Sequence, residues 1–391
     1  MPHPRQRFGS VNLLKKLSLF KVVGIQGARQ TGKSFLARQL LKPDRPDLVY
    51  QTFDQQTVLE FALRNPESFL NQHENAIPLV IDEAQKVPKI FDAVKFVVDQ
   101  KNRPGQFLLL GSTEFSKKTL IRESLTGRIG IMRLYPMMCS ETLQEPLNRD
   151  FPICARPAIE RGAWMRYIAR GGMPGFCYIR DDREREEQVK AWLDTTVNRD
   201  LALIPKLKLN PDLAMSILTA IARLEEPTAG NIARWVKRDP RVVNTHLGAL
   251  SLLFAINKLE PHRSSTGKPM FFLCDTAFAA FLGAGFERQL MTAVFQQILA
   301  KNEYLLNGSA KLYFYRTTKG SLVNFLIEEQ SKKITAIKLL FEEKIDLRQL
   351  EVLKALHKKS IDEPIKLVAL SPVKEKIKLD SVTIYPWESI C

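Results

Sequence analysis

The sequence predicts an α/β protein built around a parallel sheet, and two observations carry this prediction. Between residues 20 and 140, short apolar runs rich in β-branched residues alternate with stretches of helical periodicity. Strands joined by helices in this way lie parallel, with helices on both faces of the sheet. The central runs, residues 79–81 and 107–110, are continuously apolar, as expected of strands that are covered on both faces.

The chain of 391 residues has room for two or three domains at roughly 150 residues each. We expect a first domain over residues 1–140, a helical and winged-helix-like region over 141–283, and a second α/β domain over 284–391. The strands expected in the first domain are residues 21–27, 47–54, 77–83, 105–113 and 129–136. Those expected in the last third are residues 311–317, 322–328, 334–340, 365–371 and 381–386.

Composition limits the classes of protein that the chain can belong to. The net charge is +16, which favours a polyanionic partner such as nucleic acid, although a basic surface can also serve solubility alone. No run of about 18 apolar residues predicts a membrane span. The five cysteines are dispersed, with no C-x-x-C pair and no zinc-ligand spacing. These features predict a cytoplasmic protein with reduced thiols.

A phosphate-binding loop is predicted where the first strand ends. Eight consecutive residues there fit the pattern G-x-x-x-x-G-K-[ST] in full: Gly27, Ala28, Arg29, Gln30, Thr31, Gly32, Lys33 and Ser34. The glycines let backbone N–H groups turn toward phosphate oxygens, and the following helix presents its positive end. Lys33 is expected to reach the β- and γ-phosphates and Ser34 to ligate Mg²⁺, with Arg29 either facing solvent or serving a structural role. An ordinary basic turn is the alternative.

The second half of this site is predicted at the end of a neighbouring strand. The apolar residues 79–81 are followed directly by Asp82 and Glu83. Asp82 is expected to hold Mg²⁺ together with Ser34, and Glu83 to polarise the attacking water as a general base. Two acids that cap a helix are the alternative, and the complete phosphate loop upstream favours the metal site.

Two further residues are candidates for catalysis. Ser112, at the end of the strand at 105–113, is expected to contact the γ-phosphate or the water, with Thr113 as its alternate and a plain turn as the other interpretation. Arg128 follows a glycine and precedes a strand, so it is a candidate for stabilising the transferred phosphoryl group within the chain or across a subunit interface. A surface salt bridge is the alternative for Arg128.

These motifs resemble the predicted AAA+ ATPases of bacteria and archaea that join a nucleotide-binding domain to a winged-helix-like segment and a restriction-endonuclease-like C-terminal domain. The resemblance covers most of the chain. It is carried by GARQTGKS, LVIDEAQKVP, LLLGSTEF and ESLTGRIGIMRLYPMMCSE, and more weakly by ARGGMPGF, VNRDL, KPMFFLCDTAFAAFLG and YRTTKGSLVNFLIE. It implies ATP as the nucleotide. Ala28 stands where the family has proline and Ser34 where threonine is commoner, and both leave the backbone cradle and the hydroxyl in place.

The C-terminal third departs further from the family pattern. The positions where the family's nuclease-like domain carries metal-binding acids fall on Asn324 and Ala336, and only the accompanying Lys338 is kept, with Glu287 as a candidate acid. One carboxylate and one amide make a poor site for a hard divalent cation. We therefore expect a domain that does not cleave nucleic acid, although its lysines could still contact a phosphate backbone.

A helix-turn-helix is predicted in the middle region, with helices at 229–236 and 240–252 joined by residues 237–239. Trp235 is expected in the core of this segment. The second helix is expected to point four polar residues outward: Arg241, Asn244, Thr245 and His246. Contact with DNA and plain packing against protein are both open interpretations of such a module.

The sequence as a whole predicts a Mg²⁺-dependent ATPase that couples its nucleotide state to a conformational change, with DNA or another protein as partner. A non-hydrolysing switch that binds ATP is the alternative. The oligomeric state stays open.

Overall fold

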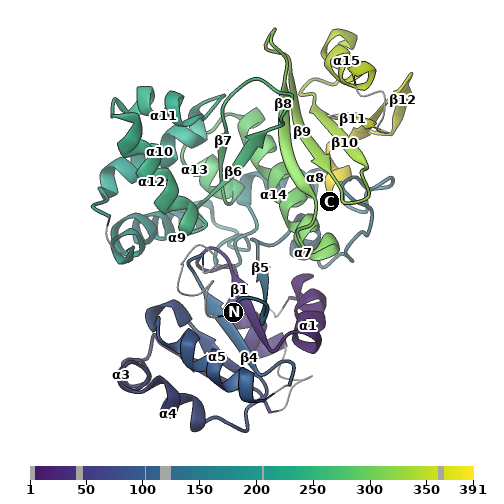
Figure 1. The fold of residues 1–391 in the computed structure, drawn as a ribbon. Coiled ribbons are helices and arrows are strands. Elements are labelled where there is room, and N and C mark those ends of the chain that lie inside the picture. The colour runs from purple at the N-terminus through teal and green to yellow at the C-terminus, as the bar shows by residue number, and fades with distance from the viewer. Residues whose placement is uncertain (1–4, 41–46, 102, 115–124, 205–206, 360–364) are drawn as a thin grey trace. The chain divides into compact units, whose positions relative to one another are not determined.

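The structure, a computed structural model, describes residues 5–40, 47–101, 103–114, 125–204, 207–359 and 365–391. The chain divides into two compact units (Figure 1). The first consists of Met1–Pro136 with Leu252–Phe254, and the second of Met137–Ser251 with Ala255–Cys391. The boundary after residue 136 is near the one expected at residue 140.

The first unit is built on a parallel sheet of five strands in the order β2-β3-β4-β1-β5. Each strand lies inside a range predicted from the sequence, so the predicted α/β fold is confirmed for this unit. The strands are β1 (Val22–Gln26), β2 (Val49–Thr52), β3 (Leu79–Asp82), β4 (Phe107–Gly111) and β5 (Ile129–Arg133).

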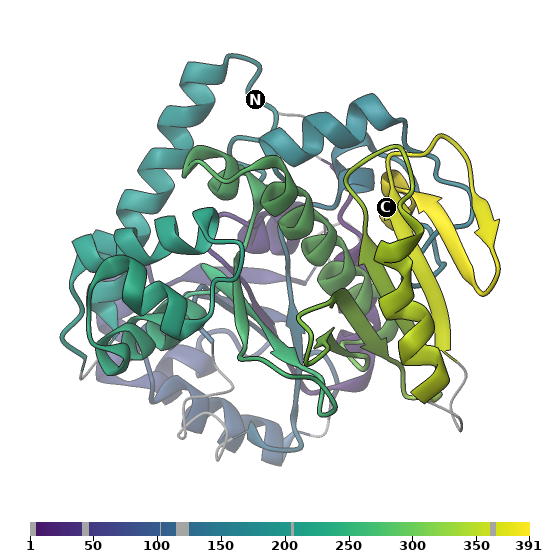
Figure 2. The ribbon, with the colours of Figure 1, turned by 90° about the horizontal axis from the view of Figure 1, so that it is seen from above.

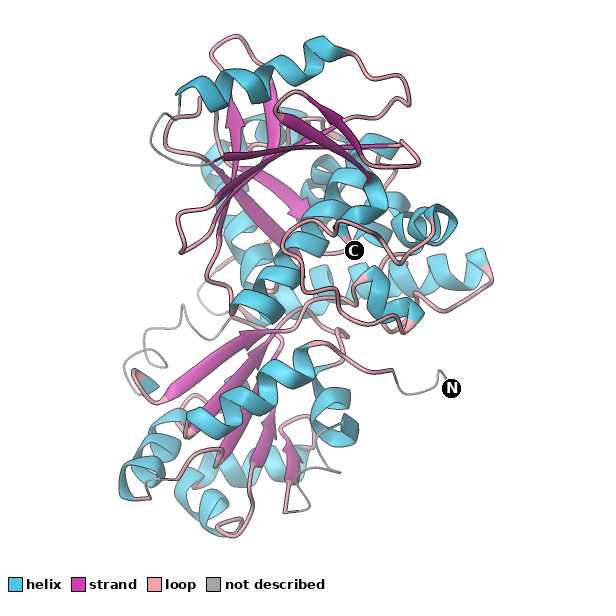
Figure 3. Cartoon of the chain, turned by 90° about the vertical axis from the view of Figure 1, so that its right-hand side faces the viewer, coloured by secondary structure: helices cyan, strands magenta, loops and turns pink. Residues whose placement is uncertain are grey.

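Helices cover both faces of this sheet. Figures 1 and 3 show α1 (Gly9–Leu19) on one side and α3 (Gln56–Arg64), α4 (Pro66–Asn71) and α5 (Ile90–Gln100) on the other. The face toward α5 buries Ile81 and Leu109 against side chains of that helix. A short helix, α2 (Lys33–Phe35), follows β1 and continues as a π-helical turn, Leu36–Leu40.

Parallel strands bring the predicted site residues to one edge of the sheet. β1 pairs with β4 so that Gln26 lies opposite Gly111, and β4 pairs with β3 so that Leu109 lies opposite Ile81. The chain therefore leaves all three strands at the same, carboxyl-terminal edge. In open parallel sheets this is the edge where ligands bind.

The second unit begins with helices and includes a group of three followed by a β-hairpin. Its helices before that group are α7 (Cys139–Leu143), α8 (Arg161–Arg170) and α9 (Asp182–Thr195), with short helical turns at Thr196–Asp200 and Leu201–Leu203. The group is α10 (Pro211–Arg223), α11 (Ala229–Val236) and α12 (Pro240–Leu252), and the hairpin strands are β6 (Ile256–Pro261) and β7 (Met270–Leu273). The predicted bounds of α11 and α12 are confirmed.

Two side chains of this group lie where the sequence did not predict them. His246 was expected to point outward, but it is buried, accepting a hydrogen bond from the Asn210 amide (3.0 Å) and donating to the Val242 carbonyl (2.8 Å). Trp235 was expected in the core, but it is 41% exposed. Both expectations are wrong. The apolar residues Ile232, Val243 and Leu247 fill this small core without them.

The remaining strands extend the hairpin into an eight-stranded sheet, with the order β12-β13-β11-β10-β9-β8-β6-β7. Residues 256–273 thus share a sheet with the C-terminal strands, and the boundary predicted at residue 283 falls between members of one sheet. The added strands are β8 (Lys311–Arg316), β9 (Leu322–Glu328), β10 (Ile334–Leu339), β11 (Ile365–Ser371), β12 (Ile377–Leu379) and β13 (Val382–Pro386).

Two helices cover this sheet. The long helix α14 (Phe286–Leu306) packs Val294 and Phe295 against Phe325 and Ile337. Helix α15 (Glu351–Lys359) packs Leu353 and Leu356 in a second core with Val323 and Leu367, and Figure 2 shows it alongside these strands. The short helix α13 (Thr276–Phe281) precedes α14, and 3-10 turns lie at Leu347–Leu350 and Trp387–Ile390.

The five cysteines are all buried and unbridged, as their dispersal predicted. Among the described residues, no helix has the length and apolar character needed to cross a membrane.

Candidate functional site

The loop from Gly27 to Gly32 forms the corner between β1 and α2. At Gly27 a Cβ atom would lie 2.3 Å from the Leu134 carbonyl oxygen, so no other residue fits there without displacing that backbone. Gly32 has a φ of 95°, which a side chain would strain. Thr31 braces the loop by donating from Oγ1 to the Ala28 carbonyl (2.9 Å). The two glycines of the motif are thus required by close approach and by backbone conformation.

Lys33 lies inside this corner rather than on the surface. Its Nζ donates to the carbonyls of Gly27 (2.9 Å) and Ala28 (2.8 Å), and its side chain is buried. Burial lowers the pKa of Lys33 to about 8, against the opposing attraction of Glu83 and Asp82. A buried ammonium that donates to two carbonyls, with two acids nearby, is well placed to meet an incoming anion.

Ser34 and Asp82 are brought together from two elements. Ser34 Oγ donates to Asp82 Oδ2 over 2.5 Å, and the hydroxyl of Tyr50 on β2 donates to the same oxygen. Burial and the hydrogen bond to Asp82 raise the pKa of Tyr50, so its hydroxyl stays a donor at neutral pH. A hydroxyl and a carboxylate beside an amide-lined loop form the hard oxygen donor set that suits Mg²⁺. These residues fit the metal predicted for them.

Glu83 and Ser112 also meet at this edge. Ser112 Oγ donates to Glu83 Oε2 over 2.9 Å, and the side-chain amide of Gln85 donates to the same carboxylate oxygen. Glu83 has a φ of 55°, a left-handed conformation that is uncommon for a residue with a side chain. The amide oxygen of Gln85 is buried and accepts no hydrogen bond within the described part of the chain. Ser112 and Gln85 therefore hold the Glu83 carboxylate from two sides at this edge of the sheet.

The first unit is also recognised by comparison with known families. Residues 19–143 match the family model of an AAA domain. This part of the chain is an AAA-type P-loop domain. The match includes all five strands and the corner built by Lys33, Ser34 and Asp82. The fold and the family together support binding of ATP by the AAA domain.

Longer relatives extend beyond the AAA domain. Uncharacterized proteins of Mycobacterium bovis and Mycobacterium tuberculosis are each 23% identical over 337 residues, which is 83% of this chain and 71% of theirs. An uncharacterized protein of Methanocaldococcus jannaschii is 27% identical over 195 residues, or 48% of this chain and 43% of that protein.

Solved structures resemble the whole chain only loosely. A Walker-type ATPase of Pyrococcus abyssi aligns with a TM-score of 0.41 and 14% identity over 70% of this chain and 94% of that one. A DNA replication initiation factor aligns with a TM-score of 0.28 and 13% identity over 62% and 85%.

Arg128 is the predicted site residue that the structure does not bring to the corner. It precedes β5, opposite the start of β1, and so lies at the amino-terminal edge of the sheet. A strand of this length spans roughly 15 Å, which separates Arg128 from the phosphate loop. Its guanidinium instead pairs with Asp99 at 2.5 and 3.1 Å. Within the AAA domain Arg128 forms a salt bridge, and a role across a subunit interface stays a prediction.

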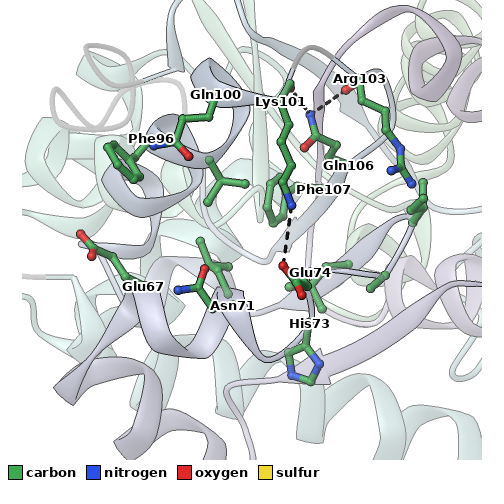
Figure 4. Close-up of a pocket in the computed structure, with 15 residues that line it drawn as sticks. Glu67, Asn71, His73, Glu74, Phe96, Gln100, Lys101, Arg103, Gln106 and Phe107 are labelled. Atoms are coloured by element: carbon green, nitrogen blue, oxygen red, sulfur yellow. Dashed lines mark hydrogen bonds and ion pairs between the residues drawn. The ribbon is translucent and has the colours of Figure 1, made fainter.

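A hollow at the same amino-terminal edge is separate from the nucleotide corner (Figure 4). It offers about 110 Å³ between α4, α5 and the starts of β3 and β4. Lys101 pairs with Glu74 across it at 3.9 Å, and Gln106 donates to the carbonyls of Lys101 and Arg103. None of the predicted site residues lines this hollow.

Three residues of the nucleotide corner escaped the sequence analysis: Arg7, Tyr50 and Gln85. Tyr50 lies in a predicted strand, but only the pairing of β2 with β3 places its hydroxyl on Asp82. Gln85 follows Glu83 by two residues, and the turn Ala84–Lys86 folds it back onto that acid. Arg7 donates to the Thr31 carbonyl of the loop, and it lies 20 residues before Gly27 in the sequence, so no local pattern indicates it.

In the second unit, the positions compared with a nuclease site lie close together without forming a metal site. Asn324 is buried and accepts from the Leu339 amide (2.9 Å), and Lys338 donates to the Leu322 carbonyl (2.9 Å). Burial lowers the pKa of Lys338, and Glu287 opposes this shift. Among the described residues, no three histidine, cysteine or acidic side chains cluster as metal ligands. That this region does not cleave nucleic acid stays a prediction.

Proposed function

We propose that the AAA domain binds ATP with Mg²⁺ and hydrolyses it, and that the second unit responds to the nucleotide state. The observation that carries this proposal is the 2.5 Å contact between Ser34 and Asp82 beside the loop that holds Lys33. A metal-binding pair next to the buried Lys33 ammonium, at the carboxyl edge of a parallel sheet, suits a nucleoside triphosphate.

The residues of the corner divide the chemistry among them. Lys33 and the amides of residues 27–34 bind the phosphates, while Ser34 and Asp82 would hold Mg²⁺, which lowers the repulsion among phosphate oxygens when bound. Glu83 is the general base that orients water. Ser112 fixes the direction of the Glu83 carboxylate through its hydrogen bond, and the side-chain amide of Gln85 donates to the same carboxylate.

Turnover of ATP by the purified chain tests hydrolysis against the alternative of a non-hydrolysing switch. We expect wild-type protein to release phosphate and Glu83→Gln to bind ATP with unchanged affinity while losing about a hundredfold or more in rate, the usual contribution of a general base. The switch is supported instead if wild type and Glu83→Gln both bind ATP and neither releases phosphate. Absence of ATP binding by wild type would contradict both.

Contact with DNA is a second candidate, favoured by the surface of α11 and α12. Helix α10 is followed by Thr228, which forms a β-bridge to Met270 on β7, and then by α11, α12 and the hairpin β6–β7. This is the order of elements in a winged helix. Arg241, Asn244 and Thr245 are exposed on α12, and Trp235 is exposed on α11. Exposed arginine, amide and hydroxyl groups on the second helix of such a motif meet phosphates and base edges.

Fluorescence anisotropy with a labelled duplex tests this candidate. Arg241→Ala combined with Asn244→Ala is expected to weaken binding by about tenfold and to reduce the salt dependence of the affinity. Arg348→Ala, which removes an exposed arginine elsewhere in the second unit, is the matched control. A wild-type affinity too weak to detect at low salt would favour the alternative that this module packs against protein.

A further inference from the structure

Arg7 reaches the phosphate loop from outside the AAA-domain match. It precedes α1, and its side chain is 3% exposed. Nη1 donates to the Thr31 carbonyl over 2.6 Å, and Nη2 donates to the Tyr135 carbonyl over 2.8 Å. One guanidinium therefore joins the loop to the backbone that follows β5.

The hydrogen bond from Arg7 to the Thr31 carbonyl fixes the orientation of the whole peptide unit between Thr31 and Gly32. The Thr31 carbonyl and the Gly32 N–H belong to the same planar trans peptide, so they point in opposite directions. The side of this peptide plane that the Gly32 N–H faces depends on φ of Gly32. Because Gly32 has no side chain, its φ of 95° is one of several values that it could adopt. Holding the Thr31 oxygen against Arg7 therefore directs the Gly32 N–H away from Arg7.

The Tyr135 carbonyl gives the guanidinium a fixed support. The adjacent Leu134 amide donates to the Gln26 carbonyl at the end of β1 over 2.7 Å, and the Leu134 carbonyl oxygen abuts Gly27. The backbone at 134–135 is thus tied to the strand from which the loop begins. A planar guanidinium has donors in a rigid fork that can engage both carbonyls at once, which a lysine ammonium on a flexible stem does not reproduce.

We propose that Arg7 is a positioning residue of the nucleotide site, whose guanidinium sets the peptide between Thr31 and Gly32 so that its N–H faces the phosphates. This inference rests on the proposed binding of nucleotide. In the competing interpretation Arg7 has a structural role only. It anchors the start of α1, and the loop keeps its phosphate-binding conformation without it.

Binding of fluorescent ADP and ATP to Arg7→Ala distinguishes these roles, with Arg64→Ala as the control for loss of an exposed arginine in the same unit. We expect Arg7→Ala to bind both nucleotides about tenfold more weakly or worse, as for loss of a charge-assisted hydrogen bond, and Arg64→Ala to match wild type. Guanidinium chloride, at concentrations that leave wild type folded, is expected to restore much of the affinity, whereas equal sodium chloride is not.

Unchanged affinity in folded Arg7→Ala protein overturns the proposal, and so does a loss that guanidinium does not restore. Where Arg7→Ala fails to fold, Arg7→Lys carries the test, because it keeps the charge and loses the fork; wild-type affinity in that variant contradicts the proposed role. A wild-type protein that binds no nucleotide is a failure of the proposed function itself, and it is seen before any variant is measured.

Discussion

Ser34 and Asp82 lie 48 residues apart in the sequence, and their Oγ and Oδ2 atoms are 2.5 Å apart in the structure. This contact predicts that the pair governs the effect of Mg²⁺ on nucleotide binding. Ser34→Ala and Asp82→Asn are expected to remove most of the gain in ATP affinity that Mg²⁺ gives wild type, because a hydroxyl and a carboxylate are lost as hard ligands. Affinity in EDTA is expected to stay near that of wild type. Titrations with and without Mg²⁺ measure both affinities, and a full Mg²⁺ effect in both variants would contradict the assignment.

Lys33 makes nucleotide affinity depend on pH in a defined direction. Burial lowers the pKa of Lys33 to about 8 in the free protein, whereas bound phosphate favours the ammonium form. Above about pH 8, binding must take up a proton, so affinity is expected to fall by up to about tenfold per pH unit and to be flat below. Lys33→Arg removes this titration, since arginine stays charged throughout. A pH-independent affinity up to pH 9.5 in wild type would contradict the role of Lys33.

Ser112 is expected to affect turnover and to leave binding alone. Its hydroxyl donates to the Glu83 carboxylate at 2.9 Å, so Ser112→Ala leaves that base less firmly oriented. Steady-state phosphate release is predicted to fall by about tenfold or more, with ATP affinity within about twofold of wild type. Ser18→Ala on the exposed face of α1 is the control for removing a serine hydroxyl. Equal loss of affinity and rate would show that Ser112 supports the fold of the corner rather than the chemistry.

Gly27 is predicted to tolerate no side chain. A Cβ atom added at this position would lie 2.3 Å from the Leu134 carbonyl oxygen. To remove this clash, the loop or the backbone after β5 would have to move. Gly27→Ala is expected to abolish nucleotide binding and to lower the melting temperature. Gly230→Ala, in helix α11 with open space around it, is expected to stabilise by up to about 1 kcal/mol. Retention of binding by Gly27→Ala would mean that the loop is not held as the structure places it.

Asp275 is predicted to make the stability of the protein fall as pH rises from about 4 to about 6. It is fully buried and accepts hydrogen bonds from the amides of Gly172 (2.8 Å) and Ala277 (2.9 Å). Burial raises the pKa of Asp275 from 3.8 to about 6 against these hydrogen bonds.

The native state therefore keeps this proton across a range in which the unfolded chain releases it. As pH rises through that range, the free energy of unfolding is expected to fall by on the order of 3 kcal/mol. Denaturant unfolding between pH 4 and 7 measures the effect. Asp275→Asn is expected to lack this step, and persistence of the step in that variant would assign it to another group.

The sequence predicts the nucleotide corner well because its parts are local. A glycine-lysine-serine turn between a strand and a helix and an acid after an apolar run each carry their own signal. The alternation of strands and helices then places Ser34 and Asp82 at one edge. The pairing of β2 with β3 and the reach of Arg7 are long-range consequences of the fold, so Tyr50 and Arg7 leave no local pattern.

Other expectations depended on which way a side chain points. Arg128 precedes a strand, and in a parallel sheet the residue before a strand lies at the edge opposite the phosphate loop. Polarity favours an outward-facing His246 and a buried Trp235, whereas helical phase places the imidazole inside with two backbone partners and leaves the indole partly exposed. Residue type alone does not fix which way a side chain points, because its position along the helical turn decides whether it faces the core.

Calorimetric titration of ATP into the purified chain with Mg²⁺, alongside Lys33→Ala, tests the central claim most directly. The structure predicts saturable one-to-one binding by wild type, weakened when Mg²⁺ is replaced by EDTA, and at least about a hundredfold loss in Lys33→Ala, as for a buried cation that contacts phosphate. A wild-type chain that takes up no nucleotide, or a folded Lys33→Ala protein that binds as well as wild type, would contradict it.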